Sequence, residues 1–252
     1  IFKKNFMQLI ILASGKGSRL GTSRTSSKLF LEIYPGKTIF KIISKIFNLF
    51  NSVIIVFGYK FLINKKKVKN IKKIQLVRNN KYSTTNMVES LFLTKKKINS
   101  DVVVIYSDIV FDLIIIKKIS KIKGSIIPLN TDWFELWQKR MNKRDVINDA
   151  EDVITKNGYL TSIGKKIKKR LPSSQFMGII KLTLRDYNKL YIFYKSLDNK
   201  KIQFTHFLDK SLSEGVIKLK YKNFNNLWAE IDTSRDLRVA QNIFKHELSY
   251  KD

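Results

Sequence analysis

One stretch near the start of the chain decides the fold: Gln8-Leu9-Ile10-Ile11-Leu12-Ala13-Ser14-Gly15-Lys16-Gly17-Ser18-Arg19-Leu20. Its mostly apolar first half runs into a loop with two glycines, which is typical of a buried parallel strand that ends beside a ligand. Glycines let the backbone approach a phosphate closely, and Lys16 and Arg19 add positive charge. The spacing matches neither the dinucleotide-binding pattern nor the P-loop, so for this loop alone a plain strand-to-helix turn is the alternative.

Strands and helices alternate through the first half of the chain. Apolar, β-branched runs predict further strands at 53–57, 74–77, 102–106 and 125–129. Apolar residues at helical spacing predict a helix over 38–50, and threonines suited to an N-cap predict another over 84–97. This alternation predicts a three-layer α/β/α sandwich around a mostly parallel, Rossmann-like sheet.

The second half is less regular. Asn157-Gly158 is the favoured two-residue hairpin turn, so it predicts a hairpin of strands 151–155 and 159–163. The remaining predicted elements are strands at 175–182, 216–221 and 227–231 and helices at 184–197 and 234–248. Because no repeat or linker interrupts the pattern, we expect a single domain over 7–252, with residues 1–6 an N-terminal extension or expression remnant.

Composition excludes several kinds of site. The 252 residues include no Cys and only two His, which rules out disulfides, thiolate zinc sites, cysteine nucleophiles and three-histidine metal sites. Carboxylate sites for hard metals stay open. No apolar run approaches the length of a membrane helix, and the first residues lack a secretion signal, so we expect a cytoplasmic protein without membrane insertion.

The net charge of +29 first suggests nucleic acid as a partner. However, 40 of the 49 basic residues are Lys and only 9 are Arg, the better bidentate reader of phosphates and bases. The lysine clusters at 65–67, 95–97 and 165–170 are also scattered along the chain. We therefore expect a solvated surface and no specific nucleic-acid partner, with a nucleic-acid-binding face as the alternative.

Acidic residues stand at the ends of two predicted strands. The run 102–106 leads into Ser107-Asp108, and ligands of open parallel sheets bind beyond the carboxyl ends of the strands. Glu230 and Asp232 are two residues apart on a predicted strand, so they point the same way and can act on one metal. The alternative for Asp232 is a capping role for the helix predicted from 234.

In chain order, these motifs resemble those of sugar-phosphate nucleotidyltransferases. The loop after the first strand is similar to Leu-Ala-x-Gly-x-Gly-x-Arg-Leu, and Lys28 matches the lysine of a Pro-Lys pair, with Ser27 in place of the proline. A solvated surface lysine is the alternative for Lys28. The resemblance implies the nucleotidyltransferase fold, a Mg²⁺ cofactor held by Asp108, Glu230 and Asp232, and catalytic roles for Arg19, Lys28, Asp108 and Asp232.

A second segment indicates the nucleotide. Residues 79–91 are similar to the Asn-x-x-Tyr-x-x-Thr-Asn-x-x-x-Ser-Leu segment of phosphocholine cytidylyltransferase-like enzymes, which implies CTP. Helix capping by 84–86 is a role that can coexist with this one. The expected nucleotide-binding residues are Leu12, Ala13, Ser14, Gly15, Gly17, Ser18, Arg19, Lys28, Asn79, Tyr82, Thr85, Asn86 and Ser107.

The acceptor side is predicted from aromatic residues. Trp133 and Trp137 are four residues apart on one helix face, with Arg140 a further turn along, and such rings can hold a quaternary ammonium. Ordinary packing of the two tryptophans is the alternative. The family resemblance adds Asp149, Glu151, Lys166 and Gly178 to the expected acceptor-binding residues.

The resemblance implies Mg²⁺-dependent transfer of CMP from CTP to a small phosphate or phosphonate monoester such as phosphocholine, with release of pyrophosphate. One alternative is a sugar-1-phosphate nucleotidyltransferase that uses another nucleoside triphosphate. Another is a non-catalytic protein of the same fold that binds nucleotides or nucleic acid. The sequence leaves the oligomeric state open, with a homodimer as one candidate.

Overall fold

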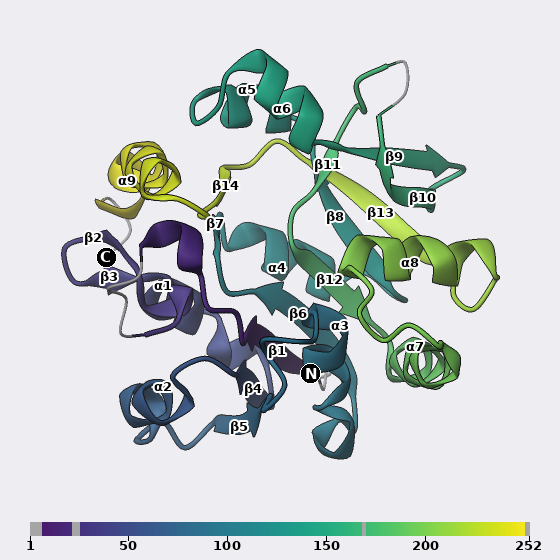
Figure 1. Ribbon diagram of the computed structural model, residues 1–252, viewed down its shortest axis with the longest axis horizontal. Coiled ribbons are helices and arrows are strands. Elements are labelled where there is room, and N and C mark those ends of the chain that lie inside the picture. Colours follow the sequence, from purple (N-terminus) through teal and green to yellow (C-terminus); the bar gives the residue numbers. More distant parts are fainter. Residues whose placement is uncertain (1–6, 22–25, 168–169, 250–252) are drawn as a thin grey trace.

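A computed structural model of the chain describes residues 7–21, 26–167 and 170–249 and is shown in Figure 1. The predicted extension at 1–6 lies outside the described residues. A mixed sheet crosses the molecule, and helices cover both of its faces (Figure 1). In the described part of the chain, no helix has the length and apolar content of a membrane span.

The first half of the sheet is parallel. Strands β5 (Ile74–Arg78), β4 (Ser52–Phe57), β1 (Met7–Ala13) and β6 (Asp101–Tyr106) lie side by side in that order and confirm the predicted strands. Their shared direction brings Ala13, Phe57 and Tyr106 to one edge of the sheet, where the loops that follow them meet.

The second half adds antiparallel pairs. Strand β12 (Ile179–Leu182) runs antiparallel to β6 and connects it to β8 (Ile126–Asn130). Strand β13 (Leu219–Phe224) lies next and runs parallel to β8. The hairpin of β10 (Tyr159–Lys166) and β9 (Glu151–Lys156) forms the last two strands at this end of the sheet. The hairpin turns at Asn157 and Gly158, which both have positive φ as its turn type requires.

Three predicted strands differ from the structure, and one of them, predicted over 216–221, is β13, which begins at Leu219 and continues to Phe224. The run 175–182 is divided into β11 (Gln175–Phe176), which pairs with β8, and β12, because Gly178 turns the chain with φ of 72°. The run 227–231 forms β14 (Trp228–Glu230), which pairs with β7 (Ile109–Phe111) in a separate two-stranded sheet. A second small sheet pairs β2 (Glu32–Tyr34) with β3 (Lys37–Thr38).

The described helices are α1 (Ile39–Ser44), α2 (Phe61–Val68), α3 (Met87–Phe92), α4 (Ile114–Ser120), α5 (Trp133–Gln138), α6 (Lys143–Asp149), α7 (Leu184–Ser196), α8 (Phe204–Ser213) and α9 (Ser234–Ser249). The predicted helices 38–50 and 84–97 are shorter than expected, since each ends early and continues in a 3₁₀ turn. Helices α2, α4, α6 and α8 have no counterpart among the predicted elements. Three of them span only two turns or so, too few for a clear apolar period.

The sheet separates two hydrophobic cores. Alternate residues of β1 point to opposite faces, so Leu9 and Ile11 join one core while Ile10 and Leu12 join the other. Helices α1, α4, α5 and α9 cover the first face, and α3, α7 and α8 cover the second (Figure 1). The structure therefore has the three-layer α/β/α architecture that the sequence predicts.

Gly58, directly after β4, generates a prediction about stability. A Cβ atom at this position would lie 2.4 Å from Cβ of Tyr82 and 2.8 Å from the carbonyl oxygen of Ser14. We expect Gly58→Ala to lower the free energy of unfolding by about 1 to 3 kcal/mol, measured by urea denaturation, because the backbones must move apart. Gly15→Ala is the control, since its Cβ would meet open space; equal stability of the two variants would contradict the prediction.

Candidate active site

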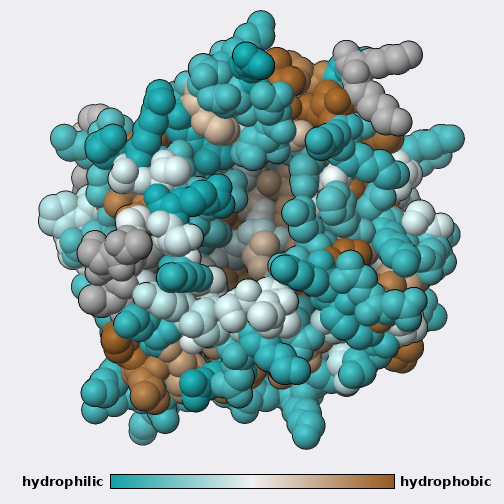
Figure 2. Space-filling view, in the orientation of Figure 1, coloured by the Kyte–Doolittle hydropathy of each residue, from teal (hydrophilic) through white to brown (hydrophobic). Residues whose placement is uncertain are grey.

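A cleft of about 650 Å³ opens beyond the carboxyl ends of β1 and β6. Figure 2 shows it as a hollow near the centre of this face of the molecule. Every predicted nucleotide-binding residue except the buried Ala13 lines this cleft. So do Asp108, Glu230 and Asp232, although Asp108 stands more than 100 residues before the other two in the sequence.

Hydrogen bonds fix the start of the glycine-rich loop. The Ser14 hydroxyl donates to the Val56 carbonyl at 3.2 Å and accepts from the Ser90 hydroxyl at 3.1 Å. The Ser14 carbonyl accepts from the backbone N–H of Tyr59 at 3.0 Å. Gly15 is exposed with open space around it, and Gly17 has φ of 63°. The loop is therefore anchored at one end and leaves room for a phosphate beside its glycines.

Asn79 organises the segment that carries the predicted nucleotide motif. Its buried side-chain amide donates to the hydroxyls of Thr85 and Ser90 at 3.1 and 3.0 Å, and its oxygen accepts from the backbone N–H of Lys81 at 2.9 Å. Asn86 is the N-cap residue of α3, yet its side chain makes no capping hydrogen bond. The expected capping role thus does not extend to the side chain of Asn86, and this residue lines the cleft.

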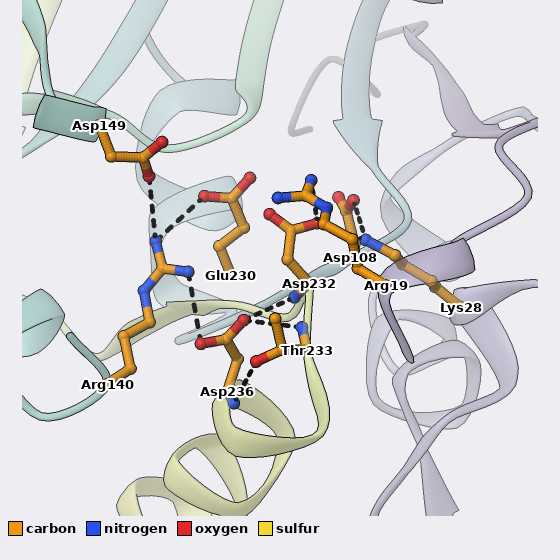
Figure 3. Close-up of polar contacts among 9 residues, drawn as sticks. All are labelled: Arg19, Lys28, Asp108, Arg140, Asp149, Glu230, Asp232, Thr233 and Asp236. Atoms are coloured by element: carbon orange, nitrogen blue, oxygen red, sulfur yellow. Dashed lines mark hydrogen bonds and ion pairs between the residues drawn. The ribbon is translucent and has the colours of Figure 1, made fainter. Parts of the chain in front are cut away.

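Lys28 lies between two of the predicted acids. Its Nζ is 3.1 Å from Oδ2 of Asp108 and 2.6 Å from Oδ1 of Asp232, and Nη2 of Arg19 is 3.0 Å from the same Asp232 oxygen (Figure 3). Burial lowers the pKa of Lys28, but the two carboxylates outweigh this effect and hold the pKa above its ordinary value. Lys28 is therefore a buried, charged component of the cleft, unlike the solvated surface lysine that was its alternative.

The loop before Lys28 explains the absence of the family's proline. The backbone N–H of Ser27 donates to Oδ1 of Asn64 at 2.9 Å, and Nδ2 of Asn64 donates to the Tyr59 carbonyl at 2.8 Å. A proline at 27 has no N–H and could not make this bond. Asn64 is fully buried in α2, and its position in a lysine-rich segment gave no sign of this role.

Strand β14 carries the other two acids to Asp108. Glu230 lies opposite Ile109 in the β14–β7 pair, and the backbone N–H of Ile231 donates to the Asp108 carbonyl at 2.8 Å. At the start of α9, Oδ2 of Asp236 accepts from the N–H groups of Asp232 and Thr233 at 3.0 and 2.8 Å. The Asp236 side chain thus caps the start of α9, and the Asp232 carboxylate instead forms ion pairs with Lys28 and Arg19.

The three acids concentrate negative charge. Burial, then the neighbouring charges of Asp108 and Asp232, raise the pKa of Glu230 to about 8, although Arg140 opposes the shift. A cation would relieve this repulsion, and carboxylate oxygens are ligands that Mg²⁺ prefers. Within the described residues no three His, Cys, Asp or Glu form a compact metal-binding group, and Nζ of Lys28 lies between Asp108 and Asp232. The donor chemistry fits Mg²⁺, and the metal role stays a prediction.

The predicted acceptor residues divide into two groups. Trp137, Asp149, Glu151 and Gly178 line the cleft. Three do not: Trp133, Arg140 and Lys166. Trp133 is 2% exposed in the core, where its indole N–H donates to the Pro172 carbonyl at 3.2 Å. Ordinary packing, the alternative, is therefore correct for Trp133, and of the two tryptophans only Trp137 lines the cleft. Arg140 is buried, and Lys166 is exposed on β10 outside the cleft.

Other residues of the acceptor end had no signal in the sequence. The rings of Phe176 and Phe204 stack nearly parallel with centroids 6.3 Å apart, and both line the cleft beside Tyr106. The Thr205 hydroxyl donates to Oε1 of Glu151 at 2.9 Å, while burial raises the pKa of Glu151. Phe204 and Thr205 begin α8, and this helix was not among the predicted elements.

Comparisons with known proteins agree with this geometry. No family model matches the chain. CTP:phosphoglutamine cytidylyltransferase of Campylobacter jejuni is 29% identical over 252 residues, which cover 92% of this chain and 98% of that protein.

Among solved structures, the inositol-1-phosphate CTP transferase of T. maritima has a TM-score of 0.74 at 21% identity, covering 96% of this chain and 97% of its own. CTP:phosphocholine cytidylyltransferase of Streptococcus pneumoniae has a TM-score of 0.73 at 19% identity, covering 95% and 99%. These similarities extend over nearly the whole chain. They confirm the resemblance: the chain is similar to the sugar-phosphate nucleotidyltransferases and has the nucleotidyltransferase fold.

Proposed function

We propose that this protein transfers CMP from CTP to a small phosphate or phosphonate monoester and releases pyrophosphate. The observation that carries the proposal is the buried Lys28 between Asp108 and Asp232, in the cleft that the glycine-rich loop also lines. The names of one sequence relative and two similar structures, all of which use CTP, support the choice of nucleotide.

The cleft supplies positive charge where a triphosphate would enter. Gly15 and Gly17 line the cleft, with open space beside Gly15 for phosphate oxygens, and Arg19 and Lys28 would stabilise the triphosphate and the departing pyrophosphate. The Arg19 side chain is 70% exposed, so it can leave Asp232 for a phosphate without disturbing the core.

Asp108, Glu230 and Asp232 would hold Mg²⁺, which when bound neutralises the reacting phosphates and orients them for in-line attack. An ionised phosphate acceptor needs no general base. The contribution of the protein is therefore to bind both substrates in one orientation.

The acceptor end favours a substrate with positive charge. Asp149 and Glu151 place carboxylates there, next to the rings of Trp137, Phe176 and Phe204. Carboxylates attract an ammonium group, and aromatic faces bind one by cation–π interaction. We call Asp149 and Glu151 the acidic wall; two neighbouring carboxylates are unusual in a chain with a net charge of +29. We therefore infer a zwitterionic acceptor such as phosphocholine or 2-aminoethylphosphonate, in preference to a sugar 1-phosphate, which has no positively charged group.

A screen of pyrophosphate release tests the function. Purified protein with Mg²⁺ is assayed with CTP, UTP, dTTP, ATP and GTP against phosphocholine, 2-aminoethylphosphonate, phosphoglutamine, inositol 1-phosphate and glucose 1-phosphate. We expect kcat/KM to be at least about 10-fold higher for CTP than for the other nucleotides, a difference of about 1.4 kcal/mol. Preference for UTP or dTTP with a sugar phosphate would support the nearer alternative, and no release from any pair would support a non-catalytic nucleotide-binding protein.

Removing one charged oxygen from either acid tests the metal-binding role. We expect Asp108→Asn or Asp232→Asn to lower turnover by at least about 10²-fold, because a lost metal ligand removes several kcal/mol of charge stabilisation. Steady-state kinetics at limiting Mg²⁺ measure this, and circular dichroism verifies the fold. Asp152→Asn, outside the cleft, is the control. Near-normal turnover in either folded variant would reject the assignment.

The acidic wall makes a separate prediction. Glu151→Gln keeps an oxygen for the Thr205 hydroxyl but removes the charge, so we expect the KM for phosphocholine to rise roughly 10-fold, or about 1.4 kcal/mol, while the KM for CTP hardly changes. The assay compares both substrates at pH 8, with Asp152→Asn as the matched control on the same strand. Equal changes in both KM values would argue against an acceptor-specific role.

A further inference from the structure

Arg140 is a buried charge outside the cleft. The residue is only 7% exposed, and its guanidinium carbon lies 4.9 Å from the centroid of the Trp137 ring. Its Nε and Nη2 atoms have no hydrogen-bond partner. Because an arginine keeps its charge when buried, this guanidinium needs compensation from nearby acids.

Three carboxylates surround the guanidinium, each from a different element. Nη2 lies 3.5 Å from Oε2 of Glu230 in β14 and 4.0 Å from Oδ2 of Asp149 at the end of α6. Nη1 lies 3.6 Å from Oδ1 of Asp236 in the first turn of α9 (Figure 3). The planar group thus faces Asp149 of the acidic wall, the metal-binding candidate Glu230, and Asp236 in the first turn of α9.

The contact with Asp236 extends to Asp232. The second oxygen of Asp236 accepts hydrogen bonds from the backbone N–H groups of Asp232 and Thr233, so it fixes the turn from which the Asp232 side chain emerges. Asp236 is 5% exposed and has few alternative positions. A guanidinium that holds Asp236 therefore also restrains Asp232.

We propose that Arg140 is a positioning residue that orients Glu230 directly, and Asp232 through Asp236, for metal binding. This proposal rests on the proposed function, because it assumes that these acids hold Mg²⁺. Without Arg140, the acids would repel one another with no buried cation on their α6 side, and their carboxylates would turn away from a shared ion. A lysine has a single ammonium and cannot reach two carboxylates with a planar fork.

The test measures metal binding without turnover. Mn²⁺ replaces Mg²⁺, CTP is present, the acceptor is omitted, and water proton relaxation reports the protein-bound ion. We expect Arg140→Gln to raise the dissociation constant of Mn²⁺ by roughly 10- to 100-fold, the effect usual for lost outer-shell partners of metal ligands. Arg140→Lys should lie between the wild type and Arg140→Gln. Arg144→Gln, an exposed position in α6, is the matched control and should bind as the wild type does.

Kinetics give a second measurement. In the Arg140 variants we expect the Mg²⁺ concentration for half-maximal turnover to rise in parallel, while the KM for CTP at saturating Mg²⁺ stays within about twofold, less than 0.5 kcal/mol. Melting temperatures identify a variant that does not fold, in which case Arg140→Lys decides. Unchanged Mn²⁺ binding in a folded Arg140 variant would overturn the proposal. Wild-type protein that binds no Mn²⁺ with CTP would instead reject the metal site itself, and with it this part of the proposed function.

Discussion

The site depends on one buried cation, Lys28, between two carboxylates that the chain brings together from distant places. Asp108 follows a central strand, Asp232 follows a strand of a separate small sheet, and Lys28 emerges from a 3₁₀ turn held by Asn64. Two carboxylates this close repel each other unless a positive charge compensates them. Lys28 supplies this charge in the structure, and the exposed Arg19 adds to it. The elements around the cleft bring Lys28, Asp108 and Asp232 into contact.

Sequence reasoning worked where local pattern and global fold agree. The run 9–13 is apolar because both faces of β1 are buried, and Gly17 in the loop that follows has a φ of 63°, which favours glycine. The same applies to Asp108, since the end of a parallel strand fixes its position. The residues that the resemblance implies for the nucleotide therefore gather in one cleft. Only Ala13, which points into the core, falls outside the cleft.

It failed where the answer depends on partners far along the chain. The pattern of 227–231 indicates a strand but not that its partner is β7. Trp133 and Trp137 share a helical spacing and the same hydrophobic core, yet only Trp137 also lines the cleft, which the spacing could not show. Arg140 looks like a surface ligand for phosphate in sequence, yet the fold buries it against three acids. Phe204 and Thr205 belong to a helix whose start has no side-chain cap.

The pairing of β14 with β7 places Asp232, which follows β14, beside Lys28, and this contact has a consequence for the order of folding. The contact between Lys28 and Asp232 joins residues 204 positions apart, so almost the whole chain must be synthesised before it can form. Long-range contacts of this kind close the largest loops and form late, because their entropic cost is repaid only when the elements between them are in place. A nascent chain in which β14 and α9 are still inside the ribosome therefore lacks Glu230 and Asp232, and Lys28 meets its second carboxylate only after they emerge.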